Sequence, residues 1–77
     1  MKSTTLDKLP LNSYGYVKSV NCSPSIKRRL LDLGLISGTK IKPILKSPIG
    51  DPLAYKVRGS TIAIRKDDSR LIDVAIM

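Results

Sequence analysis

The stretch LAYKVRGSTIAIR, at residues 53–65, limits the choice of fold more than any other part of the chain. Apolar and polar side chains alternate on both sides of Gly59-Ser60, as they do in two half-buried strands that a tight turn connects. A glycine in the first turn position is typical of a type II′ hairpin turn. We therefore predict an antiparallel hairpin with strands over residues 53–58 and 61–65. Its inward side chains are those of Leu53, Tyr55, Val57, Ile62 and Ile64.

Three further segments carry strand patterns, which brings the expected number of strands to five. They are YGYVKSV (14–20), KIKPILK (40–46) and LIDVAIM (71–77). In the second segment, Ile41 and Leu45 are expected to point inward and the lysines outward. Pro43 has no N–H group to donate to a sheet, so this strand should lie at an edge or carry a bulge there.

One helix is expected after the first of these strands. Ser23 followed by Pro24 is a helix N-terminus signal, because serine caps free backbone N–H groups and proline suits the first helical position. Gly34 is expected to end the helix in the left-handed conformation. The apolar stripe that should face the core consists of Ile26, Leu30 and Leu33. Leu31 lies about 100° around the helix from that stripe and is therefore expected to be exposed.

These elements indicate a mainly β chain with one or two short helices, and short helical turns are also expected near Leu6–Leu9 and at residues 66–70. A length of 77 residues fits a single domain over residues 1–77. The chain has no Phe and no Trp, so its core must be largely aliphatic. Short strands joined by tight turns suggest a small, closed or nearly closed β-barrel of about five strands.

The chain lacks the side chains that most catalytic and metal sites use. It has no histidine and one cysteine, Cys22, so the commonest general base and the usual zinc ligands are missing. Gly34 and Gly38 follow a helix, whereas the glycines of a phosphate-binding loop precede one. We therefore expect no enzyme activity, no cofactor and no bound metal ion.

The distribution of apolar residues predicts a cytoplasmic protein that is not inserted into a membrane. The first ten residues, MKSTTLDKLP, lack the apolar region of a signal peptide. No apolar run approaches the roughly 20 residues of a transmembrane helix. The single cysteine cannot form an internal disulfide, which fits a reducing compartment.

The charge of the chain favours an acidic or polyanionic partner. Fourteen Lys and Arg residues against six Asp give a net charge of +8. Small barrels that bind single-stranded nucleic acid usually stack bases on exposed aromatic side chains. Only Tyr14, Tyr16 and Tyr55 are available here, and Tyr55 belongs to the expected core. A nucleic-acid-binding barrel is therefore the alternative, and a protein partner is the main expectation.

Three motifs together resemble the FeoA family over nearly the whole chain. They are RLLDLGLISGTKI (29–41), SPIGDPL (47–53) and VRGSTIAIR (57–65). The resemblance implies an SH3-like barrel, related to the C-terminal domain of DtxR-type repressors. It also implies a cytoplasmic accessory protein of bacterial ferrous iron uptake. The implied partner is FeoB, a membrane permease with a cytoplasmic GTP-binding domain. Pro43 departs from the family pattern, which usually has a β-branched residue there.

The predicted contact surface for this partner combines the exposed leucine of the helix, the cations beside it and the proline-containing loop. Its residues are Lys27, Arg28, Leu31, Ile49, Pro52 and Leu53. Leu53 fits the core equally well, because it alternates with the inward residues of its strand. Ile49 is expected at an exposed loop tip. A further hypothesis is that Arg28, Arg29 or Arg58 assists GTP hydrolysis by the permease, and the sequence does not distinguish among them.

Overall fold

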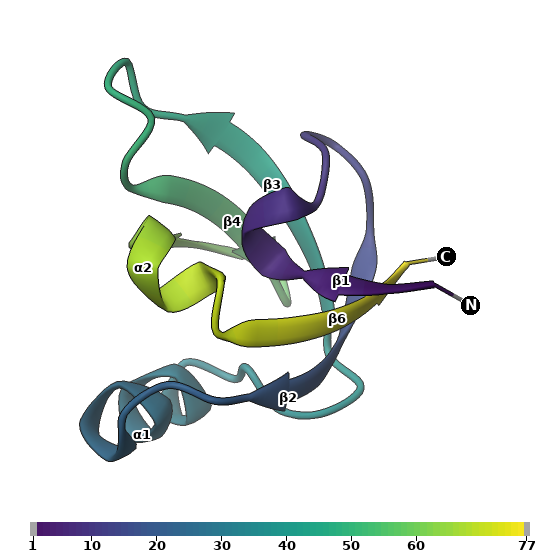
Figure 1. The fold of residues 1–77 in the computed structure, drawn as a ribbon, viewed down its shortest axis with the longest axis vertical. Coiled ribbons are helices and arrows are strands. Elements are labelled where there is room, and N and C mark those ends of the chain that lie inside the picture. Colours follow the sequence, from purple (N-terminus) through teal and green to yellow (C-terminus); the bar gives the residue numbers. More distant parts are fainter. Residues whose placement is uncertain (1, 77) are drawn as a thin grey trace.

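Six antiparallel strands form one sheet in the computed structural model, which describes residues 2–76 (Figure 1). A 3₁₀ turn and two short helices lie between the strands. In chain order, the elements are β1 (Lys2–Thr5), η1 (Leu6–Lys8), β2 (Gly15–Val20), α1 (Pro24–Asp32), β3 (Lys40–Lys46), β4 (Leu53–Val57), β5 (Ser60–Ile64), α2 (Lys66–Ser69) and β6 (Ile72–Ile76). The prediction of a mainly β chain with short helices is confirmed.

The sheet curls around the core but does not close. Its strand order is β1-β6-β2-β3-β4-β5, and within residues 2–76 no ladder joins β1 to β5. The predicted barrel of about five strands is therefore corrected to an open sheet of six. The strand that the sequence analysis missed is β1, whose segment KSTT has no apolar residue and pairs with β6 from Lys2↔Ile76 to Thr5↔Asp73. This pairing places both chain ends side by side, away from α1 (Figure 1).

The β4–β5 hairpin has the predicted strands, but its turn lies one residue earlier than predicted. Val57 pairs with Ser60, so the two turn residues are Arg58 and Gly59. Their φ angles are both positive, at 51° and 82°, which corresponds to a type I′ turn instead of the predicted type II′ turn. This turn keeps the register in which both strands direct their apolar side chains inward.

A β-bulge in β3 reverses the predicted orientation of Leu45. In the β3–β4 ladder, Pro43 pairs with Tyr55 and Leu45 pairs with Ala54, so Ile44 is an extra, unpaired residue. Pro43 consequently faces the core with Tyr55, whereas Leu45 faces outward and is 65% exposed. The predicted bulge near Pro43 is confirmed, and the predicted inward position of Leu45 is wrong.

A second bulge allows β2 to bury two valines that a strict alternation would place on opposite faces. Val17 pairs with Val74 and Ser19 pairs with Asp73, so Lys18 is the extra residue. Val17 and Val20 are both buried as a result.

Helix α1 begins as predicted but buries a narrower stripe. Ser23 occupies the N-cap position without a side-chain hydrogen bond, and its carbonyl oxygen accepts the Lys27 N–H at 2.8 Å. Leu30 is buried and Ile26 packs partly against the core. Leu33 was predicted to complete this stripe, but it is the C-cap residue of the helix and is 46% exposed.

The C-terminus of α1 is fixed by a Schellman motif. Gly34 has a φ angle of 96°, and its N–H donates to the Leu31 carbonyl oxygen at 2.9 Å. The Leu35 N–H donates to the Leu30 carbonyl oxygen, also at 2.9 Å, and the Leu35 side chain is fully buried. Both bonds follow the pattern that a left-handed glycine permits. The motif therefore anchors the end of α1 to the core.

The core is aliphatic apart from Tyr55 and Cys22. Its fully buried members include Leu6, Leu35, Ile41, Tyr55, Ile72 and Val74. The Tyr55 hydroxyl has no direct hydrogen-bond partner within residues 2–76. The hydroxyl of nearby Ser69 donates to the Lys66 carbonyl oxygen at 3.1 Å. Burial raises the pKa of Tyr55 above its usual value of 10.0; Ser69 counteracts part of this effect, and Asp7 adds slightly to it.

The free energy of unfolding is expected to fall in alkaline solution. Burial, with a smaller effect from Asp68, also raises the pKa of Cys22 above its usual value of 9.0. Since folding raises the pKa values of Cys22 and Tyr55, the unfolded chain releases these protons at lower pH than the folded chain. Their stabilising contribution is therefore complete below about pH 9 and is lost as the pH rises further.

Urea unfolding at several pH values between about 8 and 10.5 would measure this loss. The double variant Cys22→Ala/Tyr55→Phe removes both titrating groups and should show a smaller decline with pH. A decline of the same size in the variant would contradict the assignment to these two side chains.

Candidate functional site

The outer side of α1 carries the predicted cations and the predicted exposed leucine on one face. Lys27, Arg28 and Leu31 line a shallow depression together with Pro24 and Asp32. Leu31 is 49% exposed, as the helical spacing predicted. An aliphatic side chain between two flexible cations can bury apolar area against a partner, while the cations attract acidic groups around it.

A larger groove lies on the other side of α1. It has a volume of about 660 Å³ and runs between the helix, β5 and the start of α2. Helix α1 contributes Ile26, Arg29, Leu30 and Leu33, and the facing wall consists of Pro52, Ile62, Ala63, Ile64, Arg65 and Asp68. Leu31 therefore exposes an apolar side chain toward the shallow depression on the outer side of α1. Leu33, the C-cap residue of the helix, exposes one toward the larger groove.

The remaining predicted residues do not form one surface with these. Pro52 lines the groove beside α1. Ile49 is 87% exposed in the loop between β3 and β4, which lies at the end of the molecule opposite α1 (Figure 1). Leu53 is 9% exposed and pairs with Ile64 in the β4–β5 ladder, so it belongs to the core. Of the two positions that the sequence allowed for Leu53, the structure shows the core position.

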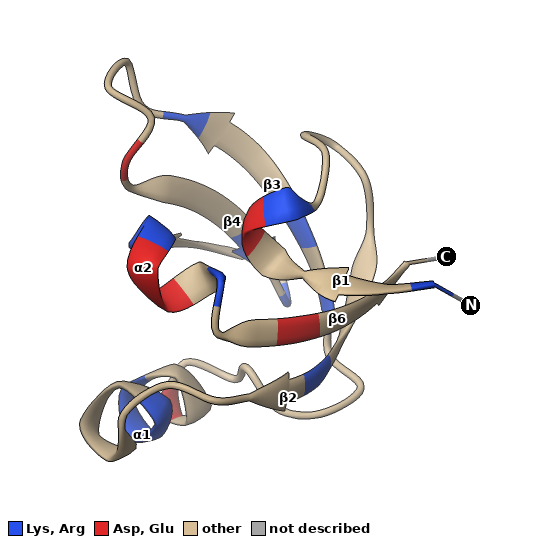
Figure 2. Cartoon of the chain, viewed as in Figure 1, with Lys and Arg blue, Asp and Glu red and all other residues tan. Residues whose placement is uncertain are grey.

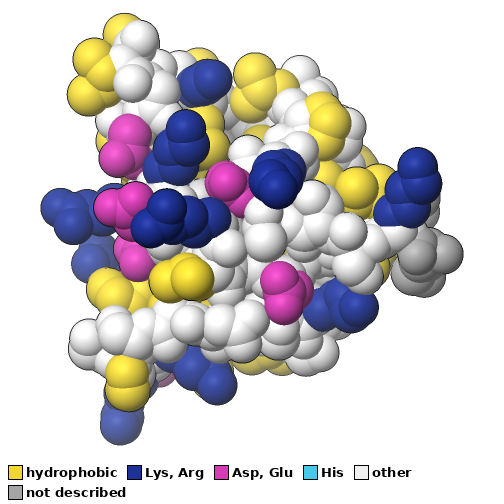
Figure 3. All heavy atoms as spheres, in the orientation of Figure 1, with side chains coloured by type: hydrophobic (Ala, Val, Ile, Leu, Met, Phe, Trp, Pro, Cys, Tyr) yellow, Lys and Arg dark blue, Asp and Glu magenta, His cyan; other side chains and the backbone are white. Residues whose placement is uncertain are grey.

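Acidic and basic groups are interspersed on the face of the molecule that carries η1 and α2 (Figures 2 and 3). Asp7, Asp67, Asp68 and Asp73 belong to η1, α2 and β6, where η1 contacts both other elements. Figure 2 shows the acidic positions of η1, α2 and β6 in red on the side of the sheet that carries α2. In Figure 3 they alternate with lysines and arginines across that face. The one ion pair within residues 2–76 joins Arg70 and Asp67 at 3.8 Å, so surface ion pairing contributes little to stability.

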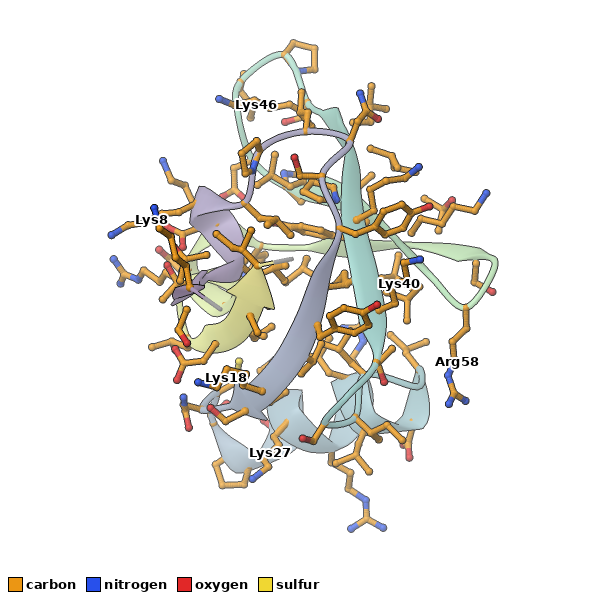
Figure 4. The ribbon with its side chains drawn as sticks, turned by 90° about the vertical axis from the view of Figure 1, so that its right-hand side faces the viewer. Lys8, Lys18, Lys27, Lys40, Lys46 and Arg58 are labelled. Carbon is orange, nitrogen blue, oxygen red and sulfur yellow. The ribbon has the colours of Figure 1, made fainter. Side chains whose placement is uncertain are left out.

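Sequence analysis missed a basic hollow on the outer face of the β3–β4 hairpin. It has a volume of about 420 Å³ and is lined by Tyr14, Gly38, Thr39, Lys40, Lys56, Arg58 and Gly59. The Lys40 and Lys42 Nζ atoms lie 4.1 Å and 4.9 Å from the Tyr14 ring centroid. Figure 4 shows Lys40 and Arg58 on the same side of the molecule. The alternating lysines of KIKPILK were the available signal, because outward residues of one strand share a face.

The side chains near α1 are suited to binding rather than to bond-making chemistry. Cys22 is buried, and its thiol lies 3.5 Å from the Asp68 carbonyl oxygen. Its raised pKa keeps it in the protonated, less nucleophilic form. Within residues 2–76, no three His, Cys, Asp or Glu side chains lie close enough together to hold a metal ion. None of the helices in the same range is long and apolar enough to cross a bilayer.

Comparison with known sequences gives a family match over almost the whole chain. A family model described as the FeoA domain matches residues 4–76. A curated relative is the Fe(2+) transport protein A/Fe(2+) transporter FeoB fusion protein of Porphyromonas gingivalis, which is 26% identical over 51 residues. The match covers 66% of this chain and 6% of that protein, so the chain spans only a small part of the curated relative.

Comparison with solved structures supports the same fold. The solution structure of FeoA from Chlorobium tepidum is 34% identical, with a TM-score of 0.92 over 96% of this chain and 70% of that one. FeoA from Stenotrophomonas maltophilia, determined with zinc and described as a prokaryotic SH3 domain protein, is 32% identical. Its TM-score is 0.80, and the match covers 92% of this chain and 88% of that one. The open six-stranded sheet is thus an SH3-like fold.

Proposed function

Because this chain belongs to the FeoA family, we propose that it is an accessory protein of bacterial ferrous iron uptake that binds the cytoplasmic side of the FeoB permease. The Porphyromonas gingivalis relative joins an Fe(2+) transport protein A and a FeoB transporter in one chain. Joining two domains raises their effective concentration for one another, which is useful where the domains interact. The fusion therefore supports FeoB as the partner of the separate chain.

The exposed outer side of α1 is the observation that carries this proposal. Leu31 is half exposed between the cationic side chains of Lys27 and Arg28. Helix α1 is held rigidly at its C-terminus by the buried Leu35, so its outer side chains are presented in a fixed geometry. A rigid helix with an apolar centre and a charged rim has the composition of a protein interface.

The predicted contact residues divide into two groups by position. Lys27, Arg28 and Leu31 form the centre of the proposed surface, and Pro52 extends it across the adjacent groove. The β3–β4 loop, which carries Ile49, lies at the end of the molecule opposite α1, so Ile49 would make a separate contact (Figure 1). The protein then acts through binding, and no step of the proposal uses a catalytic side chain of this chain.

Binding to FeoB is expected to survive an increase in salt that removes nonspecific polyanion binding. The chain should bind its cognate FeoB in nanodiscs with saturable affinity, weakening by less than about tenfold between roughly 50 and 200 mM salt. A protein that makes 6–10 phosphate contacts loses about 10³–10⁵ in nucleic-acid affinity over the same interval. Fluorescence titration at both salt concentrations, with single-stranded RNA in parallel, measures the difference.

The basic hollow gives the alternative function a specific location. Lys40, Lys56 and Arg58 could bind the phosphates of RNA, but the Tyr14 ring is already covered by Lys40 and Lys42. Tyr14 is 43% exposed, but a base that stacks on its ring would compete with these two ammonium groups. Saturable RNA binding together with no FeoB binding at either salt concentration would contradict the proposed function in favour of this alternative.

A further inference from the structure

We propose that the free edge of β5 accepts an extended peptide segment of the partner as a seventh strand. This inference rests on the proposed function, because it specifies how FeoB would be held beside α1. Strand addition satisfies the backbone groups of an exposed sheet edge, and neighbouring pockets then select the side chains of the added segment. The edge of β5 and the groove beside it provide both requirements.

The backbone of β5 directs two residues toward solvent. Strand β5 is the last strand of the sheet, so only its β4 side is paired. Val57 and Ser60 flank a two-residue turn and form the hydrogen-bonded pair that closes the hairpin. In an antiparallel ladder, hydrogen-bonded and non-hydrogen-bonded pairs alternate. The N–H and C=O groups of Thr61 and Ala63 therefore point away from β4.

These outward backbone groups are available for a partner. Both Thr61 and Ala63 are exposed. Outside the β4–β5 ladder, no backbone hydrogen bond within residues 2–76 uses the N–H or C=O group of either residue. An unpaired, exposed row of this kind is a template for another strand.

The groove beside this edge supplies apolar cover for an added strand. Three consecutive residues of β5, Ile62–Ile64, line one wall, so the edge opens directly into the groove. The opposite wall is the apolar side of α1, including the half-exposed Leu33. A strand paired with Thr61 and Ala63 would alternate its side chains, with every second one directed toward this wall.

The charges around the groove favour an acidic residue in the added strand. Arg29 and Arg65 line the groove with one carboxylate, that of Asp68. The opposite edge of the sheet differs in character, since β1 presents the polar segment KSTT. An extended segment with alternating aliphatic residues and a carboxylate therefore fits the apolar and cationic surroundings of β5 better than the polar strand β1.

Two variants of Ala63 separate backbone pairing from side-chain contact. Ala63→Pro removes the outward N–H but leaves the β4 ladder intact, and proline is accepted at edge positions whose N–H faces solvent. Ala63→Ser keeps the N–H. We expect Ala63→Pro to weaken binding of FeoB in nanodiscs by about tenfold or more, and Ala63→Ser by no more than about twofold. Urea unfolding confirms that both variants fold.

Hydrogen exchange of the unaltered chain provides a second test that needs no variant. The amides of Thr61 and Ala63 should exchange quickly in the free protein and at least about tenfold more slowly when the chain is saturated with FeoB. Saturable FeoB binding with unchanged exchange at both amides, or with full affinity for a folded Ala63→Pro, would overturn strand addition while leaving the proposed function intact. Absence of FeoB binding would overturn both.

Discussion

Replacing Tyr55 with alanine is expected to remove a large part of the free energy of unfolding of this chain. Tyr55 is the largest fully buried side chain and has an exposed fraction of 0%. Truncation of a buried aromatic side chain to alanine costs about 3–5 kcal/mol. A domain of this length has a total stability of only about 4–12 kcal/mol. Urea unfolding followed by circular dichroism should show a much lower midpoint or no folded baseline.

The conservative replacement Tyr55→Phe is the matched control. It retains the ring and removes a buried hydroxyl that has no direct hydrogen-bond partner within residues 2–76. Because burial of an unpaired hydroxyl is unfavourable, this variant should be as stable as the original chain or up to about 1 kcal/mol more stable. A loss of less than about 1.5 kcal/mol in Tyr55→Ala would show that the core does not depend on this ring.

Replacing Leu31 with glutamate is expected to weaken binding to FeoB by about thirtyfold or more. The side chain is half exposed, so the charge need not be buried in the free protein. In the complex, the carboxylate would replace the apolar centre of the interface, and central residues of this kind account for about 2 kcal/mol or more of binding free energy. Fluorescence titration with FeoB in nanodiscs measures the change.

Leu45→Glu provides the control for this experiment. Leu45 is 65% exposed on β3, and the substitution changes the net charge of the chain by the same amount as Leu31→Glu. The free energies of unfolding of both variants should lie within about 0.5 kcal/mol of that of the original chain, because exposed positions contribute little to stability. Equal weakening by the two variants would indicate that binding depends on net charge, which would remove α1 from the interface.

The sequence predicted those parts of the fold where one local pattern decides the structure. The helix signals at Ser23-Pro24 and Gly34 give its start and end. The alternation in residues 53–65 gives the hairpin and its inward side chains. In each case, the local hydrogen bonds and the burial of the side chains favour the same conformation. The short-range pattern is therefore sufficient to predict it.

Local patterns in the sequence do not predict the structure where a long-range pairing changes the pattern. The bulge at Ile44 reverses the alternation of β3, and only the β4 register shows that Leu45 faces outward. Strand β1 exists because its backbone pairs with β6, which no apolar residue in KSTT indicates. The position of the type I′ turn likewise depends on the register of β4 with β5 and places Arg58 in the left-handed region.

The same distinction applies to the candidate site. Helical spacing alone was enough to predict that Leu31 is exposed, and residue type suggested the cations beside it. The groove could not be predicted, because it is formed by α1, β5 and Pro52, which are distant in the sequence. For Leu53 the sequence allowed both a contact position and a core position, and its place in β4 directs it into the core.

The pairing of β1 with β6 has a consequence for how this domain can be attached to another protein. Lys2 lies opposite Ile76, so a linker at either end leaves from the same place, and α1 lies elsewhere on the molecule (Figure 1). Adjacent termini of this kind permit insertion into a host chain as well as end-to-end fusion. The domain can thus be tethered through either end while the helix stays accessible. The length and stiffness of the tether then set the effective concentration of the helix at its target.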